Sequence, residues 1–390
     1  MLIQAILIAL TTADPAVVVR HTKVPDPSPF YEKGFGTAVT ALGDINGDGT
    51  FDIAVGEPST TVGPFSRGSI WILLLTPDGS PATQQHIRFG AGGFAPTPDR
   101  WGHFGAALAS VGDLDGDGIN ELAVGEPRAR CDPHGFQSGA VWILFLNAEG
   151  SVRDYCRIED PNAPQGRHLR YQSHHFGQSL APLGDRDGDG IPDLAVGSTR
   201  GVTMLFLRRD GTAARHRTIG LPRRFALAPY STRLAPAGDH DHDGLVDLAV
   251  CSRRAGLILM SIGQDGVPTH HTLAEGPAPG SAFAAVIGGL GDLDHDGVED
   301  LAMGLPQDGA ESSRGSVHIL FLDAHQSIAR REVIPNRYRV TERLDRDVFG
   351  SSVAPVGDLD GNGAVDLVVG DPAEDCIWVL FRAHPALGDE

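Results

Sequence analysis

Residues 104–127 read FGAALASVGDLDGDGINELAVGEP, and the chain repeats this segment. It returns as FGTAVTALGDINGDGTFDIAVGEP at residues 35–58 and as FGQSLAPLGDRDGDGIPDLAVGST at residues 176–199. Weaker copies begin at Ser231 and Phe283, and a close copy begins at Phe349. The first acid of each copy marks the repeats at Asp44, Asp113, Asp185, Asp239, Asp292 and Asp358. Their spacing of 53 to 72 residues leaves no room for a hidden copy between them.

Each repeat contains four segments of strand length. A semi-polar run precedes the acidic loop, and an apolar run such as FDIAVGEP follows it. A third, β-rich run such as Ser69–Leu75 then leads through a polar turn at Pro77-Asp78-Gly79 to a more polar fourth run. Four antiparallel strands per repeat predict an all-β β-propeller with six blades.

The two chain ends are expected to complete one blade together. Residues 14–24 resemble a fourth strand without the preceding strands, and residues 349–381 supply strands one to three. Placing the N-terminal strand on the last blade closes the ring and removes its open edges. Seven blades remain an alternative, because residues 5–24 align without gaps with residues 70–89, which would make residues 2–10 a third strand.

Composition restricts the class of protein. The chain has 390 residues, 50 of them Gly and 27 Pro, which is too turn-rich for a helical bundle, while 41% apolar residues exclude a disordered polymer. The formal net charge of −19 argues against a nucleic-acid partner. No apolar run approaches the roughly 18 residues of a transmembrane helix.

The chain has four cysteines without CxxC spacing, which predicts neither a zinc site nor a redox motif. Cys131 and Cys156 could pair, and Cys251 and Cys376 are expected as buried thiols.

The acidic loops predict metal sites. Each nine-residue loop has oxygen-bearing side chains at positions 1, 3, 5 and 9, Gly at position 6, and a carbonyl at position 7 that can add a ligand. Such oxygen sets favour Ca²⁺ over Mg²⁺, and we expect up to six ions. The expected ligands are Asp44, Asn46, Asp48, Thr50 and Asp52; Asp113, Asp115, Asp117, Ile119 and Glu121; Asp185, Asp187, Asp189, Ile191 and Asp193; Asp239, Asp241, Asp243, Leu245 and Asp247; Asp292, Asp294, Asp296, Val298 and Asp300; Asp358, Asp360, Asn362, Ala364 and Asp366.

Two other interpretations of these loops are a metal-free turn and an EF-hand. Asp, Asn and Gly favour tight turns without any metal, but six loops with alternating oxygens favour a cation. An EF-hand needs a Glu at position 12, where this chain has Val55, Met303 or another apolar residue expected in a buried strand. His240, His242 and His295 occupy positions 2 or 4, which are expected to face outward, and are interpreted as solvated side chains.

The combination of Phe-Gly, the GDxxGDGxxDLAVG run and Gly-x-Pro resembles the FG-GAP repeat. That repeat builds the β-propeller of integrin α-subunit heads and of many bacterial secreted proteins. The resemblance implies structural calcium on one face and partner binding on the opposite face. Repeats four and five depart from the motif, with Tyr230-Ser231 and Phe283-Ala284 in place of Phe-Gly, and repeat four has Cys251-Ser252-Arg253 in place of Gly-x-Pro.

The long connections between blades are the predicted ligand-binding surface, since they combine aromatic and basic side chains. The expected contact residues are Tyr31, Arg100, Trp101, Arg170, Tyr171, Tyr338 and Arg339. The competing interpretation is that their rings fill gaps between blades while the bases are solvated. Trp71, Trp142 and Trp378 lie on third strands and are expected in the core.

These features predict a secreted or cell-surface, calcium-binding propeller that binds a protein or glycan ligand for adhesion and has no enzymatic activity. Residues 1–13 contain the apolar run LIQAILIAL and are interpreted as a signal peptide, which leaves residues 14–390 as one propeller domain. No hydrolase, metalloprotease or nucleotide-binding motif is present in the sequence. The alternative function is a calcium-dependent lyase-like enzyme that acts on acidic polysaccharides.

Overall fold

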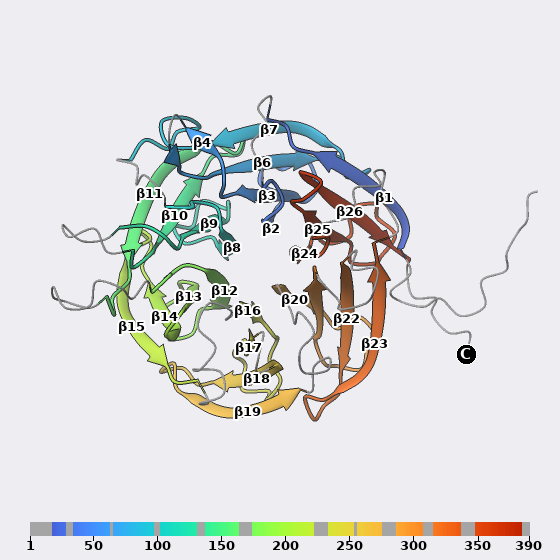
Figure 1. The fold of residues 1–390 in the computed structure, drawn as a ribbon. Coiled ribbons are helices and arrows are strands. Elements are labelled where there is room, and N and C mark those ends of the chain that lie inside the picture. Colours follow the sequence, from blue (N-terminus) through green and yellow to red (C-terminus); the bar gives the residue numbers. More distant parts are fainter. Residues whose placement is uncertain are drawn as a thin grey trace, which may run out of the picture.

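Six four-stranded antiparallel sheets are arranged around a central axis in the computed structural model (Figure 1), which confirms the predicted six-bladed propeller. The structure describes residues 18–28, 34–62, 65–96, 102–130, 137–163, 174–221, 233–252, 256–274, 286–306, 315–336 and 348–383. Within these residues every regular element is a strand. No helix in them is long and apolar enough to cross a membrane.

The strands of each blade follow one another from the axis outward. The first strands are β2 (Ala38–Gly43), β8 (Ala107–Gly112), β12 (Ser179–Gly184), β16 (Arg233–Pro236), β20 (Val286–Gly291) and β24 (Ser352–Pro355). The second strands are β3 (Asp52–Glu57), β9 (Glu121–Glu126), β13 (Asp193–Ser198), β17 (Leu248–Ser252), β21 (Asp300–Leu305) and β25 (Leu367–Asp371). The third strands are β6 (Ser69–Leu75), β10 (Ala140–Leu146), β14 (Gly201–Leu207), β18 (Gly256–Ile262), β22 (Ser316–Leu322) and β26 (Cys376–Arg382). The fourth strands are β7 (Pro81–Ile87), β11 (Val152–Glu159), β15 (Ala213–Ile219), β19 (Pro268–Ala274), β23 (Ile328–Pro335) and β1 (Val18–Pro25).

The first and last segments of the chain share blade six. Strand β1 pairs antiparallel with β26, with His21 opposite Leu380 and Val24 opposite Ile377. Residues 14–17 of the predicted N-terminal strand, and residues 2–10 of the seven-blade alternative, lie outside the described residues. A small two-stranded sheet, β4 (Thr61–Val62) with β5 (Phe65–Ser66), was not predicted.

Apolar side chains form six clusters, and each cluster lies between two neighbouring blades. The second and third strands are buried on both faces, which explains why their sequences are continuous apolar runs such as SIWILLL. Fourth strands are largely exposed, as β7 and β15 show. Trp71, Trp142 and Trp378 are buried at 6%, 4% and 3% exposure, which confirms their predicted core position.

The Phe-Gly and Gly-x-Pro motifs connect one blade to the next. The backbone N–H of Gly105 in blade two donates to the carbonyl of Gly125, while Phe104 is fully buried. Gly125 in turn lies against blade three, where a side chain on its Cα would come within 2.0 Å of the Gly177 carbonyl oxygen. Only glycine permits this approach. In blade four, Cys251 occupies the position of Gly125. The following repeat has Ala284 in place of the Gly of Phe-Gly.

Candidate metal centres

All six acidic loops join a first strand to a second strand, so they lie on one face of the ring. The aspartate at position 1 organises each loop. In loop two, Asp113 Oδ1 accepts the backbone N–H of Gly116 at 2.6 Å and that of Asp117 at 3.1 Å, while Oδ2 accepts that of Gly118 at 2.9 Å. The hydrogen bonds that the backbone N–H groups of positions 5 and 6 donate to the aspartate at position 1 recur in the other five loops. Their acceptors are Asp44, Asp185, Asp239, Asp292 and Asp358.

The acid at position 9 has a structural role that the sequence analysis did not identify. Asp300 is fully buried, and its Oδ2 accepts the backbone N–H of Leu293 at 2.9 Å. Its Oδ1 accepts the backbone N–H of Leu322 at 3.0 Å, at the end of the third strand. The same two bonds recur at Asp52, Asp193 and Asp366. This carboxylate therefore joins the loop to the sheet, as well as facing the other acids.

Burial changes the acidity of these groups. Burial, assisted by the neighbouring loop carboxylates and opposed by backbone hydrogen bonds, raises the pKa of Glu121 and Asp300 to about 7. The same cause raises the pKa of the other position 9 acids to about 6, namely Asp52, Asp193, Asp247 and Asp366. A bound divalent cation would favour their ionised form.

Position 2 of the loops faces inward, which corrects the prediction that it faces outward. Ile45, Leu114, Arg186, Leu293 and Leu359 are buried there. His240 occupies the same position, is half-buried rather than solvated, and has its pKa lowered by burial. His242 and His295 at position 4 are exposed, as predicted. The prediction was wrong at position 2 because the side chain there packs between neighbouring blades.

Several loops bring three acids together tightly enough for a metal ion. Their carboxylate oxygens lie within 4.8 Å of one another in five groups: Asp113, Asp115 and Glu121; Asp185, Asp187 and Asp193; Asp239, Asp241 and Asp243; Asp292, Asp294 and Asp300; Asp358, Asp360 and Asp366. In loop one, Asn46 replaces the acid at position 3, and its Nδ2 donates to Asp48 Oδ2 at 2.9 Å.

Three buried oxygens indicate that the loops suit a cation. Glu121 Oε1, Asp247 Oδ1 and Asp360 Oδ1 accept no hydrogen bond from the described residues. Buried carboxylate oxygens without donors are costly, and a cation would compensate them. Since the surrounding ligands are all oxygen atoms, the set suits a hard divalent ion.

Arginines of the fourth strands reach the same carboxylates. Arg153 Nη2 lies 2.7 Å from Asp117 and 3.8 Å from Glu121, and it also pairs with Asp115. Arg215 pairs with Asp187 at 3.1 Å, and Arg20 with Asp360 at 3.4 Å. These arginines also lie over third-strand phenylalanine rings. The sequence analysis did not identify them, because the contact depends on the pairing of strands.

The predicted ligand-binding residues all lie outside the described residues: Tyr31, Arg100, Trp101, Arg170, Tyr171, Tyr338 and Arg339. Cys131 also lies outside them, whereas Cys156 is a half-buried free thiol whose pKa is raised by burial. Cys251 and Cys376 are fully buried, as predicted.

Comparison with known proteins agrees with these features. The FG-GAP repeat family model matches residues 35–73 and 104–144. The chain is 32% identical over 191 residues to integrin alpha-PS5 of Drosophila melanogaster, covering 47% of this chain and 17% of that protein. It is 35% identical over 170 residues to human integrin alpha-IIb, covering 42% and 14%. The matched region is thus under a fifth of those relatives' length.

One solved structure supports the fold alone. The Malassezia sympodialis allergen Mala s 1 superposes with a TM-score of 0.50 at 11% sequence identity, over 93% of this chain and 98% of that one.

Proposed function

Since this chain is an FG-GAP repeat β-propeller that resembles integrin α-subunit heads, we propose that it is a calcium-stabilised adhesion module that binds a protein ligand. The observation that carries the proposal is the repeated loop geometry: acids converge in five loops, and three loops hold a buried carboxylate oxygen without a hydrogen-bond donor among the described residues. The proposed location is outside the cell, either secreted or on the cell surface.

Calcium is the proposed ion because each loop can offer oxygens from positions 1, 3, 5 and 9 and from the carbonyl at position 7. Sets of six to eight oxygens in flexible loops suit Ca²⁺, whereas Mg²⁺ demands a stricter octahedron. The loops contain 22 of the 50 carboxylates, and six ions would reduce the formal net charge from −19 to −7. Modest affinity suffices at extracellular calcium levels.

The proposed role of calcium is structural. Four of the six position 9 acids, Asp52, Asp193, Asp300 and Asp366, already join their loops to the end of the third strand, so an ion held there would also stabilise the blade. We propose no catalysis, since the loop acids are engaged with the backbone and the resemblance is to integrin subunits.

The proposed ligand surface is the face opposite the loops, and the support for it is the resemblance to integrin heads. The connections with Tyr31, Arg100, Trp101, Arg170, Tyr171, Tyr338 and Arg339 remain the predicted contacts. A glycan is the alternative ligand class for these aromatic and basic side chains.

The test begins with calcium. Calorimetric titration should give several bound ions, and excess chelator should lower the melting temperature. The variant Asp113→Ala should bind one ion fewer, whereas Asp154→Asn on the exposed face of β11 should bind the full number. An unchanged melting curve in chelator would contradict the proposal.

Ligand binding is tested separately. The immobilised full chain is exposed to arrays of extracellular proteins and glycans, in calcium and in chelator. We expect calcium-dependent capture of a protein, lost in Trp101→Ala and Tyr171→Ala variants that melt at the wild-type temperature. Capture that survives both substitutions would place the ligand elsewhere.

A further inference from the structure

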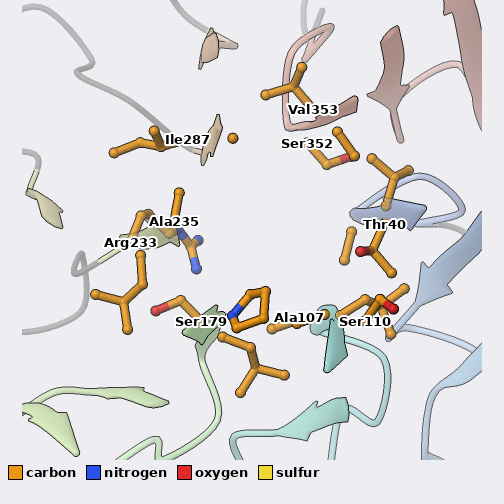
Figure 2. Close-up of a pocket in the computed structure, with 18 of the residues that line it drawn as sticks. Thr40, Ala107, Ser110, Ser179, Arg233, Ala235, Ile287, Ser352 and Val353 are labelled. Atoms are coloured by element: carbon orange, nitrogen blue, oxygen red, sulfur yellow. The ribbon is translucent and has the colours of Figure 1, made fainter. Parts of the chain in front are cut away.

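A cavity of about 450 Å³ lies on the propeller axis, enclosed by the first strands of all six blades. Figure 2 shows Thr40, Ala107, Ser179, Arg233, Ile287 and Val353 around it. Most of its wall is apolar, and Pro182, Pro236 and Pro355 line it three residues before their acidic loops. A cavity of this volume is in the range of small-molecule sites.

Arg233 brings a positive charge into this cavity. Among the described residues that line it, Arg233 is the one charged side chain, and no carboxylate faces it there. This is unusual in a chain with a formal net charge of −19. Its guanidinium Nη1 donates to the backbone carbonyl of Gln178 at 2.9 Å. Burial lowers the pKa of Arg233, as expected for a cation without a nearby acid.

Other polar groups around the cavity are already engaged. Gln178 is 8% exposed, and its backbone carbonyl is the acceptor of the Arg233 hydrogen bond. The hydroxyls of Thr40 and Ser352 are likewise engaged with backbone carbonyls.

The position of Arg233 is special to blade four. The corresponding first-strand residues in four other blades are the small Ala38, Ala107, Ser179 and Ser352, each opposite a glycine of the second strand. Arg233 is instead opposite Cys251. Blade four thus differs from these four blades at both members of the pair. The difference places a cation in a cavity whose other described lining residues are uncharged.

We propose that the axial cavity binds a small organic monocarboxylate, with its carboxylate on Arg233 and its apolar body along the cavity wall. Arg233 begins a first strand, so the carboxylate would lie at the end away from the acidic loops. The three prolines and the Ala and Val side chains would surround the apolar part. Inorganic anions fit less well, because they would leave this apolar volume without contacts.

Calorimetry on the full chain in saturating calcium tests the proposal, with hexanoate and benzoate as probes. We expect binding of one carboxylate per chain, at least tenfold tighter than binding of hexanamide or hexylamine, and tighter than binding of acetate. Arg233→Met should weaken hexanoate binding at least tenfold while raising the melting temperature without ligand. The matched control Arg217→Met, on exposed β15, should bind like the wild type.

Arg233→Lys provides a second variant that keeps the charge, and it should retain more hexanoate binding than Arg233→Met. Equal binding of hexanoate and hexanamide, or retained binding in Arg233→Met, would overturn the proposal. Chloride or phosphate binding as tightly as hexanoate would overturn the carboxylate assignment. Because calcium stoichiometry is measured independently, a failure here is distinguishable from a failure of the calcium proposal.

Discussion

Asp300 provides a direct test of how calcium stabilises a blade. This carboxylate is fully buried, accepts two backbone hydrogen bonds, and has a pKa raised from 3.8 to about 7, chiefly by burial. The unfolded chain therefore releases this proton at lower pH than the folded chain does. Between about pH 4 and pH 7 the folded state binds more protons, so its stability without calcium falls as pH rises.

The magnitude follows from the size of the shift. About three pKa units at about 1.4 kcal/mol each correspond to roughly 4 kcal/mol lost across this range, as an upper limit. The variant Asp300→Asn cannot ionise. In chelator, its stability relative to the wild type should therefore rise by about 3 kcal/mol between pH 4.5 and pH 7.5, because this window covers about 2.3 of the roughly three pKa units.

The assay is urea denaturation of both proteins in chelator and in calcium at several pH values. In calcium at pH 7.5 the stability difference should shift in favour of the wild type by about 2.7 kcal/mol for an ion at 100 times its dissociation constant, because the variant lacks this ligand. Asp154→Asn makes the same change at an exposed acid of β11 outside the loops and is the matched control. A constant difference between Asp300→Asn and the wild type across this pH range would refute the reasoning.

Two further substitutions test the contacts between strands. Arg153→Met removes the guanidinium that contacts Asp115 and Asp117. Loop two should then bind calcium about two- to fivefold more tightly by calorimetry, which is the size expected for loss of a partly exposed ion pair. Weaker binding would mean that Arg153 supports the site. Gly125→Ala places a methyl group within 2.0 Å of the Gly177 carbonyl oxygen and should lower the free energy of unfolding, measured in urea, by about 1–3 kcal/mol or more. Gly220→Ala, with open space around it, should lower it by less than about 1 kcal/mol. Equal losses would contradict the role given to Gly125.

The repeated motif is sufficient to predict a propeller and the order of the strands in each blade, whereas the choice between six and seven blades required the structure. Six copies of one motif must form six copies of one unit, and a unit of four strand-length segments cannot bury its apolar faces alone. The third strand Ser69–Leu75 was predicted to the residue, because a fully apolar run between polar turns has a clear beginning and end. The acids of the loops were also evident, since alternate oxygens around a glycine form a local pattern.

Tertiary structure decided which partners these residues meet. The double hydrogen bonding of Asp300 depends on the end of β22, which is 22 residues away in the chain. The inward position of His240 depends on packing between blades, and the contact of Arg153 with Asp115 depends on the pairing of strands. Arg233 enters the axial cavity only because six first strands surround one axis. A local pattern can specify a strand or a loop, but contacts between distant segments exist only once the ring has closed.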